Sequence, residues 1–157
     1  MDDSRRSIQA AIEHAAAFRA ELRRFLARTD TATTHAGLTP QRYDLLLAIK
    51  AAGGQATINE LCSYLQMRQT AVTELVKRAE EAKLTVRTQS TVDRRAVVVT
   101  ITAEAETRLK RGVDALHEDR VALGDALELL AETFRGPVPE LHPVLEPSLR
   151  FRRTPTA

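Results

Sequence analysis

Two short runs of strand-forming residues, in a chain otherwise patterned as helices, constrain the fold most strongly. Residues 84–88, LTVRT, and residues 96–101, AVVVTI, are rich in β-branched side chains, and a short polar link separates them. Two such runs are typical of a β-hairpin. The link carries a charged triplet, Asp93, Arg94 and Arg95, directly before the valine run. We expect the valines to be buried against the domain and to hold the charged tip in place.

Two short helices joined by a tight turn are predicted just before this hairpin. Thr57 and Glu60 have the spacing of a capping box, in which each side chain satisfies a free N–H at the start of a helix. This helix is expected to end near residues 66–68. A second run at helical spacing follows, with the apolar residues Val72, Leu75, Val76 and Ala79.

Further helices are predicted on the N-terminal side. Residues 4–28 repeat apolar positions at steps of three and four, whereas residues 29–38 are polar and are predicted to form a loop. A Thr-Pro pair at positions 39–40 is a helix start, because threonine can cap and proline at the first helical position loses no needed N–H. A Gly-Gly pair at positions 53–54 ends that helix, since glycine adopts left-handed backbone without steric cost.

The C-terminal part is predicted to contain two helices and a tail. Thr102 caps a helix whose apolar residues follow heptad spacing over residues 109–134, with Arg120 as the one polar member. We expect residues 124–125, Gly-Asp, to separate two helices. Arg120 is either a rim arginine lying along apolar surface or part of an ion pair that fixes the register of a dimer. Residues 136–157 contain five of the six prolines and are predicted to be an extended or partly disordered tail.

The composition excludes several classes of protein. The chain has 157 residues, of which 43% are hydrophobic and only 4% aromatic, so one domain with an aliphatic core is expected. Its single cysteine, Cys62, excludes an internal disulfide framework, and we expect it to fill the core as a small apolar side chain. The four histidines lack metal-ligand spacing. Because no nucleophile with a base, paired carboxylates or phosphate-binding glycine loop is recognisable, we predict no enzyme and no cofactor.

Charge and hydropathy indicate where in the cell the protein works and which partners it can bind. The N-terminus lacks the apolar run of a signal peptide, and no segment approaches about 18 consecutive apolar residues, so we expect a cytoplasmic protein without a membrane partner. The net charge is +2. Any nucleic-acid surface must therefore come from local clustering of basic residues.

The order of the predicted elements indicates a winged helix-turn-helix fold, mainly α with a small β-hairpin wing. We expect one domain over residues 1–135, in which residues 38–102 form a DNA-binding lobe. Residues 4–28 and 103–135 would form dimerisation helices, because their apolar seams exceed what one small domain buries. The second helix of the pair has the size to enter a major groove, and the wing tip can enter a minor groove.

Several motifs, in this order, resemble those of one known family. A Leu-Thr-Pro helix opening stands at residues 38–40, and AVTELV at residues 71–76 is similar to a recognition-helix pattern Thr-Val-Thr-x-Leu-Val. An Asp-x-Arg wing stands at residues 93–95, followed by a β-branched strand that ends in Ile-Thr at residues 101–102. Over residues 38–109 the chain resembles the MarR family of bacterial transcriptional regulators.

Three positions depart from the pattern of that family. Lys83 stands where the family usually has glycine before the first wing strand, so either a non-glycine residue adopts left-handed backbone there or the turn differs. Arg68 replaces the usual serine cap of the recognition helix, which leaves that helix without a side-chain cap or starts it elsewhere. Glu74 stands where a basic or polar residue is common.

The resemblance and the helix-turn-helix order place the expected DNA contacts on the second helix and the wing. Asp93 is expected to brace an arginine, while Arg68 and Arg87 are expected to contact phosphates. The full set of candidate DNA-binding residues is Arg68, Gln69, Thr70, Thr73, Lys77, Arg78, Arg87, Arg94 and Arg95.

The resemblance also implies partners and regulation. It implies a homodimer bound to a pseudo-palindromic operator, and repression that is relieved by a small aromatic or anionic effector bound between the dimer helices and the DNA-binding lobe. An alternative from another class is a winged-helix protein-interaction module that has lost most DNA affinity. Binding to random duplex DNA distinguishes the two, because a DNA binder loses affinity steeply as salt rises.

Overall fold

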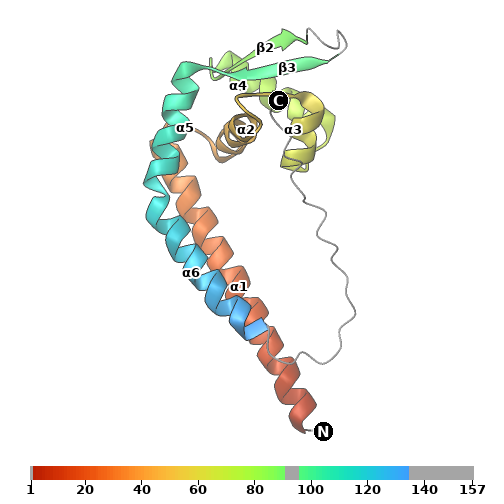
Figure 1. Cartoon of the computed structure of the whole chain (residues 1–157), viewed down its shortest axis with the longest axis vertical. Coiled ribbons are helices and arrows are strands. Elements are labelled where there is room, and N and C mark those ends of the chain that lie inside the picture. The colour runs from red at the N-terminus through yellow and green to blue at the C-terminus, as the bar shows by residue number, and fades with distance from the viewer. Residues whose placement is uncertain (1, 91–95, 135–157) are drawn as a thin grey trace, which may run out of the picture.

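A lobe of short helices and a small sheet lies at one end of a long helix, and two C-terminal helices return along that helix (Figure 1). The structure, a computed structural model, describes residues 2–90 and 96–134. It confirms the predicted winged helix-turn-helix fold with flanking long helices. Its elements, in chain order, are α1 (Asp2–His35), α2 (Pro40–Ala51), β1 (Gln55–Thr57), α3 (Ile58–Leu65), α4 (Gln69–Glu81), β2 (Thr85–Gln89), β3 (Val97–Ile101), α5 (Ala103–Ala115) and α6 (His117–Phe134).

Helix α1 is longer than the sequence indicated, and the prediction of a loop over residues 29–38 is wrong for most of its length. The helix continues to His35. Its threonines stay helical because their hydroxyls bond to carbonyls of the preceding turn, as Thr29 does to Phe25 at 2.9 Å. Thr33 is fully buried, so this end of the helix is held by packing as well. The turn that follows is made by Gly37, whose φ is +75°.

The local signals for helices α2, α3 and α4 are confirmed. The hydroxyl of Thr39 accepts from the backbone N–H of Arg42 at 3.3 Å, and Pro40 is the first residue of α2. Thr57 and Glu60 form the complete capping box of α3. Helix α3 ends at Gln66, a residue in left-handed conformation with φ +52°, and α4 begins three residues later.

The hairpin is confirmed, but it belongs to a three-stranded antiparallel sheet with the order β1-β3-β2. Thr85 pairs with Ile101 and Gln89 with Val97, which fixes the register of the wing. The sequence patterns did not reveal β1. This strand has three residues, too few for an alternating pattern, and its structure depends on the edge of β3, where Ala56 faces Val99.

The break between the last two helices lies at Leu116 and not at residues 124–125, so that prediction is wrong. Leu116 is 1% exposed, and its carbonyl accepts from the N–H of Arg120 at 2.9 Å, which starts α6 at once. Gly124 lies inside α6, with nothing within 4 Å of the position of a Cβ. A single exposed glycine costs a helix only about 1 kcal/mol, so it does not have to end one.

The core lies in the lobe and is aliphatic, as predicted. Its fully buried large aliphatic side chains come from the lobe and from the break between α5 and α6: Leu45, Leu46, Ile49, Leu61, Leu84, Leu116, Val72, Val76 and Val99. Cys62 is half-buried and packs against this cluster, which fits its expected role as a small apolar side chain. None of the helices in the described residues is both long and apolar enough to cross a membrane.

Candidate nucleic-acid interface

Helix α4 has one buried face and one exposed polar face. Val72, Leu75, Val76 and Ala79 are buried against the lobe. The opposite face carries the residues that the sequence proposed for this helix, together with Glu74, and all of them are exposed: Gln69, Thr70, Thr73, Glu74, Lys77 and Arg78. The structure therefore brings the predicted contact residues of this helix onto a single face that other elements of the described chain leave open.

The N-terminus of α4 is uncapped by any side chain. Arg68 occupies the N-cap position with extended backbone, and its side chain makes no capping hydrogen bond. The first N–H groups of a helix lack partners within the helix and carry a partial positive charge. Together with the exposed guanidinium of Arg68, this end of the helix favours an anionic group such as a phosphate.

Two arginine side chains donate hydrogen bonds to backbone carbonyls of α4. Arg42 of α2 donates from Nη2 to the carbonyl of Arg78 at 3.3 Å. The Nε of Arg78 in turn donates to the carbonyl of Glu74 at 3.4 Å. Arg42 was not among the residues proposed from the sequence. Its role depends on contact between α2 and α4, which no local pattern specifies.

Arg87 on β2 is engaged by a carboxylate of α4. Its Nε and Nη2 donate to Oε2 of Glu80 at 2.7 and 2.5 Å, and its backbone N–H donates to Oε1 at 3.1 Å. The hydrogen bonds from Arg87 lower the pKa of the Glu80 carboxyl below its ordinary value. This clamp ties the first wing strand to the recognition helix. The expected phosphate contact of Arg87 stays a prediction, and it requires the guanidinium to divide its N–H donors between Glu80 and the phosphate.

The turn before the wing contains the first departure from the family pattern. Lys83 has φ +59°, so the left-handed backbone is kept although the residue is not glycine. Its carbonyl accepts from the hydroxyl of Thr102 at 2.9 Å, and the next residue, Leu84, donates to the carbonyl of Ala79 at 2.9 Å. These bonds hold a conformation that costs a non-glycine residue about 1–2 kcal/mol.

The wing tip itself, with Asp93, Arg94 and Arg95, lies outside the described residues. Its base is defined on both sides. The N–H of Ser90 donates to the carbonyl of Ala96 at 2.9 Å, directly beyond the last pair of the two strands. The proposed roles of the three tip residues therefore stay predictions.

The lobe is joined to the long helices by polar contacts. Arg108 of α5 donates to the carbonyl of Gly37 at 3.1 Å, and Lys50 of α2 forms an ion pair with Glu106 of α5. Tyr43 is buried at this junction, and burial raises the pKa of its hydroxyl while the nearby Arg120 opposes the shift. Arg120 is exposed and forms no ion pair with a described residue, so its role in a dimer stays a prediction.

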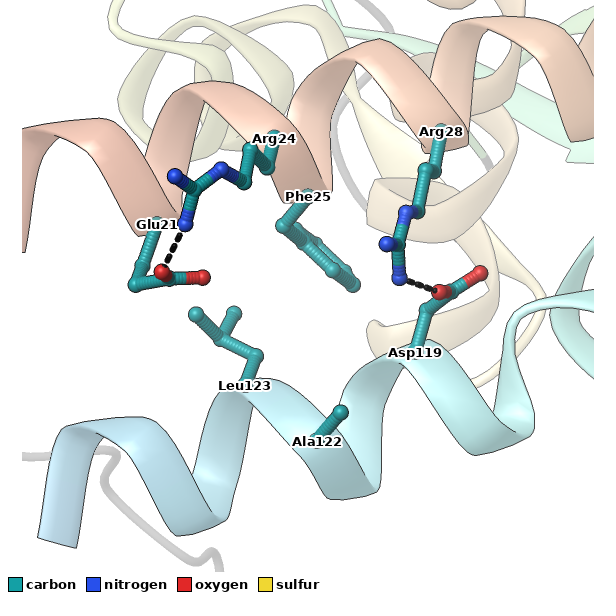
Figure 2. Close-up of a pocket in the computed structure, with 7 residues that line it drawn as sticks. All are labelled: Glu21, Arg24, Phe25, Arg28, Asp119, Ala122 and Leu123. Carbon is teal, nitrogen blue, oxygen red and sulfur yellow. Dashed lines mark hydrogen bonds and ion pairs between the residues drawn. The ribbon is translucent and has the colours of Figure 1, made fainter. Parts of the chain in front are cut away.

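A pocket between α1 and α6 lies away from the lobe (Figure 2). Phe25 points from α1 toward Ala122 and Leu123 of α6, between two ion pairs. Arg28 binds Asp119 across the two helices at 2.5 Å, and Arg24 pairs with Glu21 within α1. Because both guanidinium groups are neutralised in place, the residues that line this pocket offer no free positive charge to an anionic effector.

The motifs that suggested a family recur in a sequence comparison. Residues 36–96, from the last turn before α2 to the start of the second wing strand, match the model of the MarR family. Over this segment the chain is similar to the MarR family. This segment includes the recognition helix α4 with Arg68 at its N-cap, the left-handed Lys83 and the first wing strand, β2. No curated protein sequence matches the chain significantly.

Solved structures of MarR regulators share the fold of the whole described chain. The MarR-family regulator SP03579 has a TM-score of 0.68 at 21% identity and covers 85% of this chain and 89% of its own. A mutant of MarR from Escherichia coli in complex with operator DNA has a TM-score of 0.65 at 16% identity, over 82% and 96%. BpsR of Bordetella bronchiseptica, whose DNA binding is regulated by 6-hydroxynicotinic acid, has a TM-score of 0.58 at 18% identity, over 76% and 91%. At these identities the likeness establishes the fold, including the helices that flank residues 36–96.

Proposed function

We propose that this chain is a transcriptional regulator that binds double-stranded DNA through its MarR-like domain. One observation carries the proposal: α4 presents a continuous exposed polar and basic face, beside a hairpin whose tip contains two arginines. A helix of this kind fits the major groove, where its side chains reach base edges, and a neighbouring arginine can enter a minor groove. A similar fold is known in complex with operator DNA.

The proposed contacts divide by their chemistry. Gln69, Thr70 and Thr73 lie on the N-terminal half of α4 and carry uncharged donors and acceptors suited to base edges. Lys77 and Arg78 follow on the same face and are assigned to phosphates, as is Arg68 at the uncapped N-terminus. Phosphate contacts position a protein on the duplex, whereas base contacts specify the sequence.

We propose that the DNA-binding form is a homodimer. The long helices expose large apolar side chains far from the lobe: Ile8, Ile12 and Leu26 of α1, and Val121 and Leu129 of α6, each at least 52% exposed. Apolar surface gathered on two adjacent helices is typical of a protein interface. A two-fold axis through these helices would place two recognition helices on a pseudo-palindromic operator. Sedimentation at micromolar concentration should give a dimer, and a monomer would contradict this assembly.

We further propose that the regulator is a repressor released by a small aromatic or anionic effector. The support comes from the resemblance and from BpsR, which shares the fold and whose DNA binding is regulated by 6-hydroxynicotinic acid, an aromatic carboxylic acid. The proposed location is the junction between the lobe and the long helices. Calorimetric titration with small aromatic acids, with and without duplex DNA, tests this regulation. An effector should bind the free protein more tightly than the DNA-bound protein, and equal affinity for both would contradict release by an effector.

One observation favours a second function, a winged-helix protein-interaction module with weak DNA binding. Glu74 lies on the recognition face, and Glu80 neutralises Arg87 beside it. Binding of the native protein to random duplex DNA across a salt series separates the two functions. A DNA binder loses affinity as salt rises, with a slope of about 0.9 per phosphate contacted. Absence of binding even at low salt would favour the interaction module.

A further inference from the structure

We propose that Glu74 is a specificity-determining residue that recognises a cytosine in the operator, an inference that rests on the proposed DNA-binding function. Glu74 lies in the middle of the exposed face of α4, one turn after Thr70 and one turn before Lys77 and Arg78. At about 100° per residue, its side chain projects close to the centre of this face and away from the buried stripe.

The carboxylate of Glu74 forms no ion pair with any described residue, although cations stand three and four positions later. A glutamate four residues before an arginine is the favourable order for an ion pair on a helix. Arg78 nevertheless directs its Nε to the backbone carbonyl of Glu74 at 3.4 Å. Glu80, on the same helix, is by contrast fully engaged by Arg87. The two oxygens of Glu74 therefore remain as acceptors on the exposed face.

The chemistry of the major groove selects the base. An ionised carboxylate only accepts hydrogen bonds. Guanine presents the acceptors O6 and N7, thymine presents O4, and adenine places its N6 donor beside the acceptor N7. Cytosine alone presents a donor, its N4 amino group, with no acceptor beside it on the same base. A carboxylate held against base edges is therefore attracted by cytosine and repelled by the other bases. Where the protein is bound at a position without that cytosine, the carboxylate is repelled by the phosphates and gains no hydrogen bond in return.

The test compares the native protein with Glu74→Gln, which keeps the size and removes the charge. Each protein selects duplexes from a library with a randomised central segment. The native protein should enrich cytosine at one position in each half-site, and replacing that base should weaken binding by roughly tenfold or more. Glu74→Gln should lose this preference or shift it to adenine, whose N6 and N7 an amide can bind together. It should also bind random duplex more tightly.

Glu81→Gln is the matched control, because Glu81 is exposed at the last position of α4 and the substitution removes the same charge. This variant should tighten binding to all duplexes to a similar extent and leave the selected bases unchanged. Thermal melts establish that both variants fold. If Glu74→Gln selects the same bases as the native protein, the inference is overturned while DNA binding stands. If the native protein binds no duplex at low salt, the proposed function and the inference fall together.

Discussion

Two glycines in the long C-terminal helices should respond in opposite directions to the same substitution. Gly124 lies inside α6, and a Cβ at this position would meet nothing within 4 Å. Alanine restricts the unfolded chain and forms helix more readily, with no steric cost in the fold. Gly124→Ala should therefore raise the free energy of unfolding by ~0.5–1 kcal/mol. For a chain of this size, that corresponds to a rise in Tm of about 1–4 °C.

Gly112 of α5 has a crowded environment and provides the matched comparison. A Cβ there would stand 3.1 Å from Cε2 of Tyr43, 3.5 Å from Cδ2 of the same ring and 3.9 Å from the Cβ of Ala36. Tyr43 is 5% exposed, so its ring has little free space into which it can move. Overpacking of this kind typically costs about 1–3 kcal/mol. After the gain in helix propensity, Gly112→Ala should lower stability by about 1 kcal/mol.

Thermal unfolding followed by circular dichroism measures both effects, at one fixed protein concentration because the stability of a dimer depends on concentration. The native protein and both variants should be compared in parallel, with sedimentation to establish that the assembly is unchanged. A lower Tm for Gly124→Ala would refute the placement of Gly124 in an open part of a continuous helix. An unchanged or higher Tm for Gly112→Ala would refute the close contact with Tyr43.

Four further predictions concern the interface and the core. Arg94→Ala should weaken binding to specific and random duplexes alike, by about 1–3 kcal/mol. If the contact is to a phosphate, the salt slope should also fall by about 1. Equal binding by the variant and the native protein would show that the wing tip does not touch DNA. Thr73→Ala should cost more affinity on the operator than on random duplex, because base contacts specify sequence; equal losses would argue for a phosphate contact. Cys62→Ala should bind DNA as the native protein does, and peroxide should affect the DNA binding of both proteins equally. If mild oxidant releases DNA from the native protein and not from the variant, Cys62 has a redox role. The pKa of Glu80 is lowered in the folded protein, so its ion pair with Arg87 contributes stability above the ordinary pKa of 4.5. This contribution is lost as the pH falls through the lowered pKa. The difference in Tm between the native protein and Arg87→Ala should therefore shrink in acid, and a constant difference would contradict the clamp.

Signals that are local in the sequence predicted the structure well. The capping box of Thr57 and Glu60, the Thr-Pro start of α2 and the glycine pair after it each act within a few residues, and each forms as expected. The buried stripe of α4 follows from its spacing alone. The exposed face of α4 could therefore be assigned before any tertiary contact was known.

Features that depend on contacts between distant segments were missed. The strand β1 exists because β3 offers its edge, and the bond from Arg42 to Arg78 exists because α2 packs on α4. Local signals also misled where packing overrides them. The polar threonines at the end of α1 stay helical because they are bonded internally and partly buried, and the helix break falls at buried Leu116 because that side chain enters the core.

The balance of charge on the recognition surface bears on how such a protein would find its site. On α4, its N-cap and Arg87, four cations stand against three carboxylates, and Glu80 already neutralises one of the cations. Attraction to phosphates provides most of non-specific DNA affinity, so this surface should hold random duplex weakly. Under the proposed function, the predicted contacts of Arg94 and Arg95 would supply much of the electrostatic attraction, while the uncharged side chains of α4 and Glu74 would discriminate between sequences. A weak non-specific background raises the ratio of specific to random binding, which decides occupancy among many competing sites. A carboxylate on the recognition face is therefore compatible with a DNA-binding function, provided that the native protein binds specific duplexes much more tightly than random duplex.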